Sequence, residues 1–243
     1  MPNLLKSLVR HTLFRKSGSL VCFDKNYAAI GRLLRGHRVT GILDAGASNG
    51  RLSRRFLQMF PEAHVFAFEP QSLYRQTLQR FAQEDPRFHP QFAALSDTAG
   101  TADLKVTCSP GTTSLFVPEQ RMKTLYPKET VATAVEKVEV VTIDDWAIHN
   151  GDPPIQLMKF DIQGGELKAM RGASRVLGTS TLLVYTEIFF NRLYEGGSIY
   201  SEIDLCLREY GFVLHNIFKP RSDRNDVLVQ ADAIFVHGER LGL

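Results

Sequence analysis

The segment from residue 44 to 50 has the residue types of a turn that binds a nucleotide-derived cofactor, and it reads Asp-Ala-Gly-Ala-Ser-Asn-Gly. Its glycines let the backbone come close to a ligand above the first turn of a following helix. The turn lacks the third glycine of the dinucleotide pattern and the Lys of a P-loop. A carboxylate at Asp44 would repel a pyrophosphate, but it suits the ammonium and sulfonium groups of S-adenosylmethionine (SAM). We therefore expect SAM to contact Asp44, Gly46, Ala47, Ser48, Asn49 and Gly50.

Glu69 is a second acid in a position where such cofactors bind. It follows a predicted strand at 64–68, and Pro70 comes directly after it. In doubly wound sheets, an acid about 20 residues beyond the glycine turn bonds the ribose hydroxyls. Alone, Asp44 could cap a helix and Glu69 could lie in a solvated turn. Because the two acids follow consecutive strands, we favour a shared SAM site that includes Glu69 and Pro70.

Two more carboxylates, Asp161 and Glu187, end the predicted strands 156–160 and 181–187. The carboxyl ends of parallel strands meet at one edge of a sheet, so both acids should lie over the same crevice. They could act as base and electrostatic partner, or they could hold a divalent cation. We predict the catalytic pair and no metal site, and we also expect Asp161 to contact SAM, because it lies nearer the cofactor-binding strands than Glu187 does. A helix N-cap is the alternative role for Asp161, and for Glu166 a helix-dipole partner is the favoured one.

Alternating strands and helices must position these residues, and the apolar pattern from residue 39 onward predicts them. The predicted strands are 39–43, 64–68, 88–95, 156–160, 181–187, 212–218 and 232–237. The predicted helices are 26–34, 52–60, 72–83, 166–177 and 198–210. Such units are typical of a parallel sheet with right-handed crossovers. We predict one doubly wound α/β fold of about seven strands, ending in an antiparallel pair.

The predicted domain covers residues 39–243 and follows an N-terminal helical extension at 1–38. Within the domain, residues 99–143 break the alternation of strands and helices. Two half-exposed strands are predicted there, at 102–107 and 136–143. This excursion is too poor in apolar residues to form a core of its own.

The chain has 243 residues, of which 44% are hydrophobic and 23% charged, and this is the composition of an ordinary globular protein. No apolar run approaches the roughly 20 residues that a membrane span needs. The three cysteines are far apart and suit a reducing compartment, so we expect a cytoplasmic protein. The net charge of +3 is uneven, because residues 1–40 hold eight basic residues and one acid. Only this arm would attract an anionic partner.

The basic arm has a narrow apolar stripe that includes Leu5, Leu8, Val9 and Leu13. We favour a helix that caps the domain over one that binds a membrane surface or a partner. A mitochondrial transit peptide is a further alternative, since such peptides are also rich in Arg and poor in acids. We expect no nucleic-acid partner, because no basic stripe with interleaved aromatic residues is present. A homo-oligomer remains open.

Several motifs, in their order and spacing, resemble the FkbM-type SAM-dependent methyltransferases. They are Asp44–Gly50, Phe68-Glu69-Pro70, Ala94-Leu95-Ser96-Asp97, Val141-Thr142-Ile143-Asp144, Lys159–Glu166 and Arg171-Gly172-Ala173. The resemblance implies a Rossmann-like seven-stranded fold and O-methylation of hydroxyls on sugars, polyketides or related small molecules. It places SAM over the glycine turn, Glu69 on the ribose and the turn at Ala94 and Leu95 beside the adenine. It also places the small polar residues Thr113 and Ser114 near the acceptor.

The sequence departs from the family pattern at two positions. In the glycine turn the family usually has Asn directly after Gly-Ala, whereas this sequence has Ser48 there, followed by Asn49. In the segment after the predicted strand 156–160, Gln163 stands where the family has an acid. The replacement at Gln163 weakens any role that needs a negative charge there, metal ligation included. Two other functions stay open, namely a SAM-binding protein without turnover and an NAD-dependent oxidoreductase. His149 and His215 are less favoured as bases, because lone histidines are more often structural.

Overall fold

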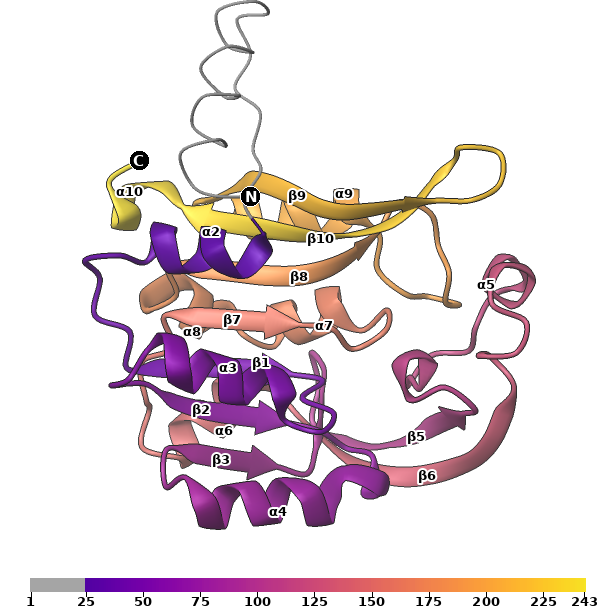
Figure 1. The fold of residues 1–243 in the computed structure, drawn as a ribbon, viewed down its shortest axis with the longest axis horizontal. Coiled ribbons are helices and arrows are strands. Elements are labelled where there is room, and N and C mark those ends of the chain that lie inside the picture. The colour runs from indigo at the N-terminus through magenta and orange to yellow at the C-terminus, as the bar shows by residue number, and fades with distance from the viewer. Residues whose placement is uncertain (1–24) are drawn as a thin grey trace, which may run out of the picture.

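The structure is a computed structural model that describes residues 25–243, and a seven-stranded sheet forms its centre (Figure 1). The strands are β1 (Gly41–Ala45), β2 (His64–Phe68), β3 (Phe88–Gln91), β7 (Leu157–Phe160), β8 (Leu183–Phe189), β9 (Phe212–Ser222) and β10 (Leu228–His237). Their order in the sheet is β3-β2-β1-β7-β8-β10-β9. All pairs up to β8 are parallel, whereas β10 is antiparallel to both β8 and β9. The predicted doubly wound α/β fold is confirmed.

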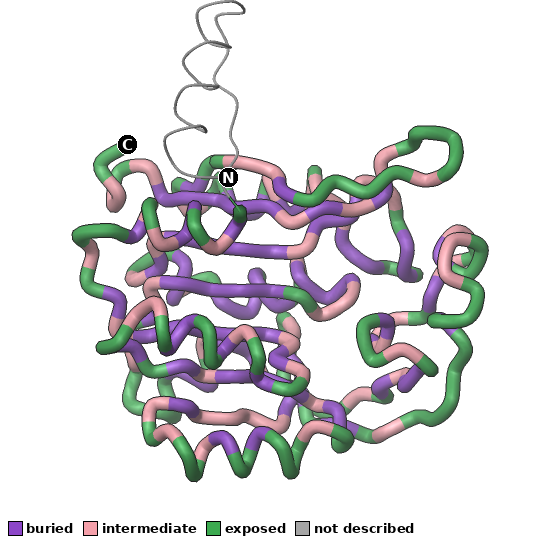
Figure 2. Tube along the Cα trace, viewed as in Figure 1, coloured by how far each residue is buried: buried purple, intermediate pink, exposed green. Residues whose placement is uncertain are grey.

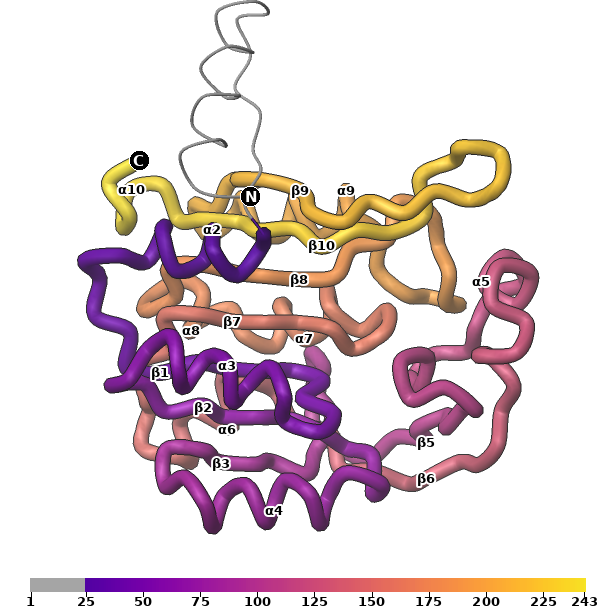
Figure 3. Tube along the Cα trace, in the orientation of Figure 1, coloured from indigo at the N-terminus to yellow at the C-terminus, as the bar shows by residue number. Residues whose placement is uncertain are grey.

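Helices cover both faces of the sheet, as Figures 1 and 3 show. One face carries α2 (Asn26–Leu33), α3 (Arg51–Met59) and α4 (Arg75–Glu84), the last preceded by the 3-10 helix η1 (Ser72–Tyr74). The other face carries α6 (Ile143–His149), α7 (Glu166–Arg171), α8 (Ser174–Thr179) and α9 (Tyr200–Arg208), and α10 (Gly238–Leu241) follows β10.

The core consists of two apolar clusters, one on each face of the sheet. Phe56 of α3 and Leu78 of α4 belong to one cluster, and Met170 of α7 and Leu207 of α9 belong to the other. The central strands β1, β7 and β8 are buried almost throughout (Figure 2). Burial on both faces explains why these strands read as continuous apolar runs rather than as alternating ones.

A second, smaller sheet extends beyond the carboxyl ends of the parallel strands (Figure 1). It consists of β4 (Ala94–Leu95), β5 (Gly100–Thr107) and β6 (Ala132–Val141), in the order β4-β6-β5. The 3-10 helix η2 (Pro110–Thr112) and α5 (Gln120–Leu125) lie between β5 and β6 in the chain. Buried apolar residues of β5 and β6 pack with Ala94 of β4 in a small cluster. The excursion lies at the edge of the main sheet where the ligand site was expected (Figure 1).

Two predicted elements are each divided in the structure. The predicted strand 88–95 leaves the main sheet after Gln91, and its last residues pair with β6 instead. The predicted helix 166–177 breaks into α7 and α8 at Gly172. A Cβ atom on Gly172 would lie 2.2 Å from the carbonyl oxygen of Ser96, so this close approach requires glycine and interrupts the helix.

Three other boundaries differ from the predictions. Strand β8 continues to Phe189, so Glu187 lies inside the strand and not at its end. Helix α6 was not predicted, although Thr142 caps it by accepting a hydrogen bond from the N–H of Asp145 at 3.0 Å. Strands β9 and β10 are longer than predicted, which shortens the turn between them.

The N-terminal predictions are tested only from residue 25 onward. The predicted arm helix with its apolar stripe, and the alternative of a targeting segment, lie outside the described residues. Helix α2 forms as predicted, and its Asn26 side chain donates a hydrogen bond to the hydroxyl of Tyr185 in the sheet at 2.6 Å. Within residues 25–243, no helix has the length and apolarity to cross a membrane.

Asp144 should contribute to stability, because it holds the start of α8. Its carboxylate accepts hydrogen bonds from the N–H groups of Arg175 and Val176, at 2.8 and 3.1 Å. We expect Asp144→Ala to lower the free energy of unfolding by about 1–2 kcal/mol, measured by urea denaturation. Asp103→Ala, which removes an exposed carboxylate on β5, is the control. Equal stability of the two variants would contradict the assignment.

Candidate active site at the carboxyl edge of the sheet

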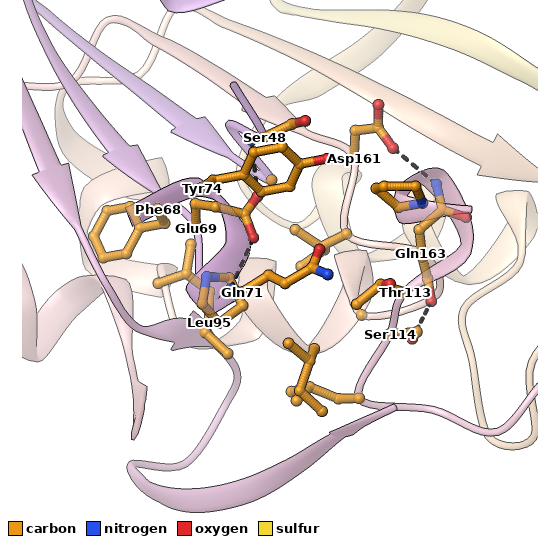
Figure 4. A pocket seen from close by; sticks show the side chains of 18 of the residues that line it. Ser48, Phe68, Glu69, Gln71, Tyr74, Leu95, Thr113, Ser114, Asp161 and Gln163 are labelled. Atoms are coloured by element: carbon orange, nitrogen blue, oxygen red, sulfur yellow. Dashed lines mark hydrogen bonds between the residues drawn. The ribbon is translucent and has the colours of Figure 1, made fainter. Parts of the chain in front are cut away.

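A cavity of about 260 Å³ opens where β1, β2 and β7 end, under the overhanging excursion. Glu69 stands on one side of this cavity, and Asp161 and Gln163 stand on the other (Figure 4). The predicted site residues in its wall are Gly46, Ser48, Glu69, Pro70, Ala94, Leu95, Thr113, Ser114 and Asp161. The predicted site residues outside the wall are Asp44, Ala47, Asn49, Gly50 and Glu187. The residues from separate motifs therefore converge, and their ligand roles stay predictions.

Asp44 lies beneath the glycine turn and does not face the cavity. Its carboxylate is fully buried, accepts a hydrogen bond from the Ser53 hydroxyl at 2.6 Å and forms an ion pair with Lys159 at 3.1 Å. The expectation that Asp44 would meet the ammonium group of a cofactor does not fit this orientation. Its partner is an ammonium group of the protein itself.

This ammonium group belongs to Lys159, which was not among the predicted site residues. Its Nζ donates hydrogen bonds to the carbonyl oxygens of Ala45 and Gly46, each at 2.8 Å, in addition to the ion pair with Asp44. Burial alone would lower the pKa of Lys159, but nearby carboxylates, Asp44 foremost, outweigh burial and raise it. A lysine inside the buried strand 157–160 was a detectable signal, because a buried charge needs a partner.

The glycine turn is packed tightly between the ends of two strands. The N–H groups of Gly46 and Ala47 both donate to the carbonyl oxygen of Phe68, at 2.9 and 3.1 Å. Gly46 has a φ of +76°, and a Cβ atom there would lie 1.9 Å from the carbonyl oxygen of Asp161. Only glycine fits this position, so the turn that borders the cavity is held against both β2 and the segment after β7.

Glu69 lines the cavity, and the backbone holds both of its carboxylate oxygens. One carboxylate oxygen accepts the N–H of Ser48 at 2.8 Å and the other accepts the N–H of Gln71 at 2.9 Å. Because each carboxylate oxygen has two acceptor positions, one on each remains for a ligand. Burial raises the pKa of Glu69, and the two backbone donors offset this effect only in part.

Asp161 and Glu187 are brought together, but through a third side chain. The Nε2 atom of Gln163 donates to Asp161 at 2.9 Å and to Glu187 at 2.8 Å. Asp161 is exposed in the cavity wall, whereas Glu187 is half-buried behind Gln163 and also accepts a hydrogen bond from Gln230 at 2.9 Å. Desolvation, followed by the charge of Asp161, raises the pKa of Glu187 well above its ordinary value. Glu187 therefore contacts Gln163 and lies outside the cavity wall, and its catalytic role stays a prediction.

Glu166 holds the loop that carries Asp161 and Gln163. Its buried carboxylate accepts the N–H groups of Ile162 and Gly164, both at 2.9 Å, and the hydroxyl of Ser198 at 3.0 Å. Glu166 therefore has a structural role in the first turn of α7, where the sequence analysis favoured a helix-dipole partner. The N-cap residue of α7 is Gly165, so Asp161 does not have the alternative role of helix cap.

The excursion is fastened to the same loop, because the Ser114 hydroxyl donates to the backbone oxygen of Gln163 at 2.7 Å. His149 and His215 are exposed and lie outside the cavity wall. In residues 25–243, no group of three or more His, Cys, Asp and Glu side chains is arranged to hold a metal ion.

The seven-stranded sheet, with its antiparallel last pair and a cavity at the carboxyl edge, defines a class I methyltransferase fold. A solved structure with this fold is a methyltransferase FkbM from Methylobacillus flagellatus KT. It matches with a TM-score of 0.50 and 17% identity, over 82% of this chain and 44% of that one. The model of the methyltransferase FkbM domain matches residues 44–214. The chain therefore belongs to the FkbM methyltransferase family, as the motifs predict.

Two relatives are similar in sequence. The 2-O-methyltransferase NoeI of Sinorhizobium fredii is 30% identical over 162 residues, which cover 64% of this chain and 65% of NoeI. The methyltransferase sdnD of Sordaria araneosa is 28% identical over 194 residues, which cover 70% of this chain and 73% of sdnD. The match thus spans slightly less than two thirds of the length of NoeI.

The buried pair of Lys159 and Asp44 should be essential for stability. Lys159→Met leaves a buried carboxylate without its partner, so we expect a loss of about 3–5 kcal/mol in the free energy of unfolding. Adding Asp44→Asn should recover part of that loss. Arg38→Met, which breaks the exposed pair with Glu62, should cost about 1 kcal/mol or less. If chemical denaturation shows similar losses for Lys159→Met and Arg38→Met, the buried pair does not have this role.

Proposed function

We propose that this protein transfers a methyl group from SAM to a hydroxyl group of a sugar, a polyketide or another small molecule. The observation that carries the proposal is one cavity with a ribose-compatible acid, Glu69, on one side and an exposed carboxylate, Asp161, on the other. Membership of the FkbM family supports methyl transfer. The name of NoeI, a 2-O-methyltransferase, supports a hydroxyl oxygen as the acceptor.

The residues present fit SAM in three respects. Glu69 keeps acceptor positions for the two ribose hydroxyls, and Phe68 and Leu95 give the cavity an apolar wall suited to an adenine ring. Gly46, which has no side chain, allows the backbone to approach the ligand closely. When bound, SAM supplies an electrophilic methyl group on a sulfonium.

Asp161 is the residue placed to assist the acceptor. A hydroxyl group has too high a pKa to attack at neutral pH without help, so a base that accepts or orients its proton accelerates transfer. The Asp161 carboxylate is exposed in the cavity and is held from the side by Gln163. Thr113 and Ser114, from the excursion, border the same space and can orient the acceptor. Glu187 contributes through Gln163, as a positioning residue.

Glu69→Gln should weaken SAM binding. The variant loses the charged acceptor for the ribose, so we expect a loss of roughly 1.5–3 kcal/mol, or about 10- to 150-fold in Kd by calorimetry. The ionised carboxylate is the form that accepts hydroxyl donors, and the pKa of Glu69 is raised. Wild-type affinity should therefore fall as the pH decreases through that raised pKa, whereas the variant should lack this dependence.

Glu62→Gln, an exposed acid in the same part of the chain, is the matched control and should leave the Kd of SAM unchanged. The wild-type protein should show no binding of NAD. Tight binding of NAD without binding of SAM would contradict the cofactor assignment and favour an oxidoreductase.

Asp161→Asn should reduce methyl transfer more than cofactor binding. General-base assistance is typically worth about 10²–10⁴-fold, so we expect turnover to fall at least about tenfold, with a smaller change in the Kd of SAM. The measurement is transfer of a labelled methyl group to a panel of glycans and hydroxylated small molecules. Asp103→Asn, on the exposed face of β5, is the control. Full turnover by Asp161→Asn would place the base elsewhere, and absence of transfer to every acceptor would favour a SAM-binding protein without turnover.

A further inference from the structure

Gln163 joins two carboxylates that would otherwise repel each other. Its Nε2 atom carries two hydrogens, and they are donated to Asp161 at 2.9 Å and to Glu187 at 2.8 Å. A point between two carboxylates is where a divalent cation commonly binds in proteins, because carboxylate oxygens are its preferred ligands. Here the point between the carboxylates is taken by the NH₂ group of a neutral amide.

The orientation of this amide is fixed by its other contacts. The Oε1 atom of Gln163 accepts a hydrogen bond from the hydroxyl of Tyr194 at 2.8 Å. Turning the amide over would direct its oxygen at two carboxylates, which offer no hydrogen in their ionised form. Tyr194 is itself buried and packs against Gly164, so the donor that holds the oxygen cannot move away easily.

The backbone of Gln163 is held as firmly as its side chain. Its φ is +56°, a left-handed conformation that a residue with a long side chain adopts only when its surroundings impose it. Its carbonyl oxygen accepts the Ser114 hydroxyl, and Glu166 binds the N–H groups on both sides of it, at Ile162 and Gly164. The bridge between the carboxylates is thus a rigid part of the site.

We propose that Gln163 is a positioning residue that replaces a divalent cation between Asp161 and Glu187 and holds the Asp161 carboxylate toward the acceptor. The catalytic part of this inference rests on the proposed function, whereas the bridge itself can be tested without turnover. A neutral bridge has a specific advantage beside SAM. It leaves the negative charge of Asp161 unneutralised, and this charge attracts the sulfonium group. A divalent cation at the same point would repel the sulfonium group.

The first test converts the bridge into a third acid. Gln163→Glu places three carboxylates together, and this arrangement favours binding of a divalent cation. Calorimetry with Mn²⁺ should give a Kd at least about tenfold lower for Gln163→Glu than for the wild type. Adding Asp161→Asn to the variant should remove that gain. Equal Mn²⁺ affinity of Gln163→Glu and the wild type, or a gain that survives Asp161→Asn, would overturn the inference.

The second test removes the two donors and keeps the length of the side chain. In Gln163→Met, Glu187 loses a hydrogen bond to its charged form, so its pKa should rise further, by roughly half a unit to one unit. The pKa is followed by carbon-detected NMR of the Glu187 carboxyl. The groups facing Glu187 are Asp161 and Glu166 from the β7–α7 segment, Asp232 from β10 and Tyr194.

Tyr194→Phe is the milder variant for the same titration. It removes only the donor that orients the amide, so the shift should have the same sign and be smaller. An unchanged titration of Glu187 in Gln163→Met would overturn the inference. Neither readout requires turnover, so failure of the bridge is distinguishable from failure of the proposed methyl transfer.

Discussion

The ammonium group of Lys159 contacts three oxygens, one from the carboxylate of Asp44 and two from the carbonyls of Ala45 and Gly46. These contacts join the end of β7 to the turn that borders the cavity. A buried charge is costly unless it is paired and fully hydrogen-bonded, so the end of β1 and the end of β7 must remain together. Such pairs seldom add net stability over an apolar substitute. Their effect is to favour one packing of the buried groups over others. Here the pair fixes the glycine turn against the end of β7, and Asp161 follows Lys159 by two residues in that segment.

From this contact the remaining site follows along the chain. The turn after β1 is fastened to the end of β2 through the carbonyl oxygen of Phe68, and the next residue after Phe68 is Glu69. The segment after β7 carries Asp161 and then Gln163. Gln163 donates a hydrogen bond to Glu187 of β8, and its carbonyl oxygen accepts one from Ser114 of the excursion. The cavity therefore lies between groups whose backbones are tied to one another, and a ligand meets a preorganised wall.

Much of this arrangement was predictable from the sequence, because it follows from periodicity and from strand ends. The glycine turn, Glu69 after the second strand and Asp161 after strand β7 all occupy the predicted edge of the sheet. The orientation of Asp44 was not predicted, since a sequence shows that an acid is present but not which cation it meets. The sequence does contain that cation, because Lys159 is a charged residue within the otherwise apolar strand β7.

Glu187 illustrates a second limit of the sequence. The apolar run gave no sign of where the strand stops, so Glu187 was placed at its end, although β8 continues for two more residues by pairing with β10. The bridging role of Gln163 was also hidden, because it depends on contacts with Tyr194 and Ser114, which are remote in the chain. The division of strand 88–95 between two sheets has the same origin. These features depend on contacts between residues that are far apart in the chain, and local sequence patterns do not reveal such contacts.

We propose that SAM binds with its ribose at Glu69 and its reactive centre toward Asp161. A crystal structure of the complex with S-adenosylhomocysteine, the demethylated product, tests this claim most directly. We expect both ribose hydroxyls within hydrogen-bond distance of the Glu69 carboxylate, the adenine beside Leu95 and the sulfur facing Asp161 and Gln163. A nucleoside bound away from Glu69, or a sulfur directed away from Asp161, would contradict it.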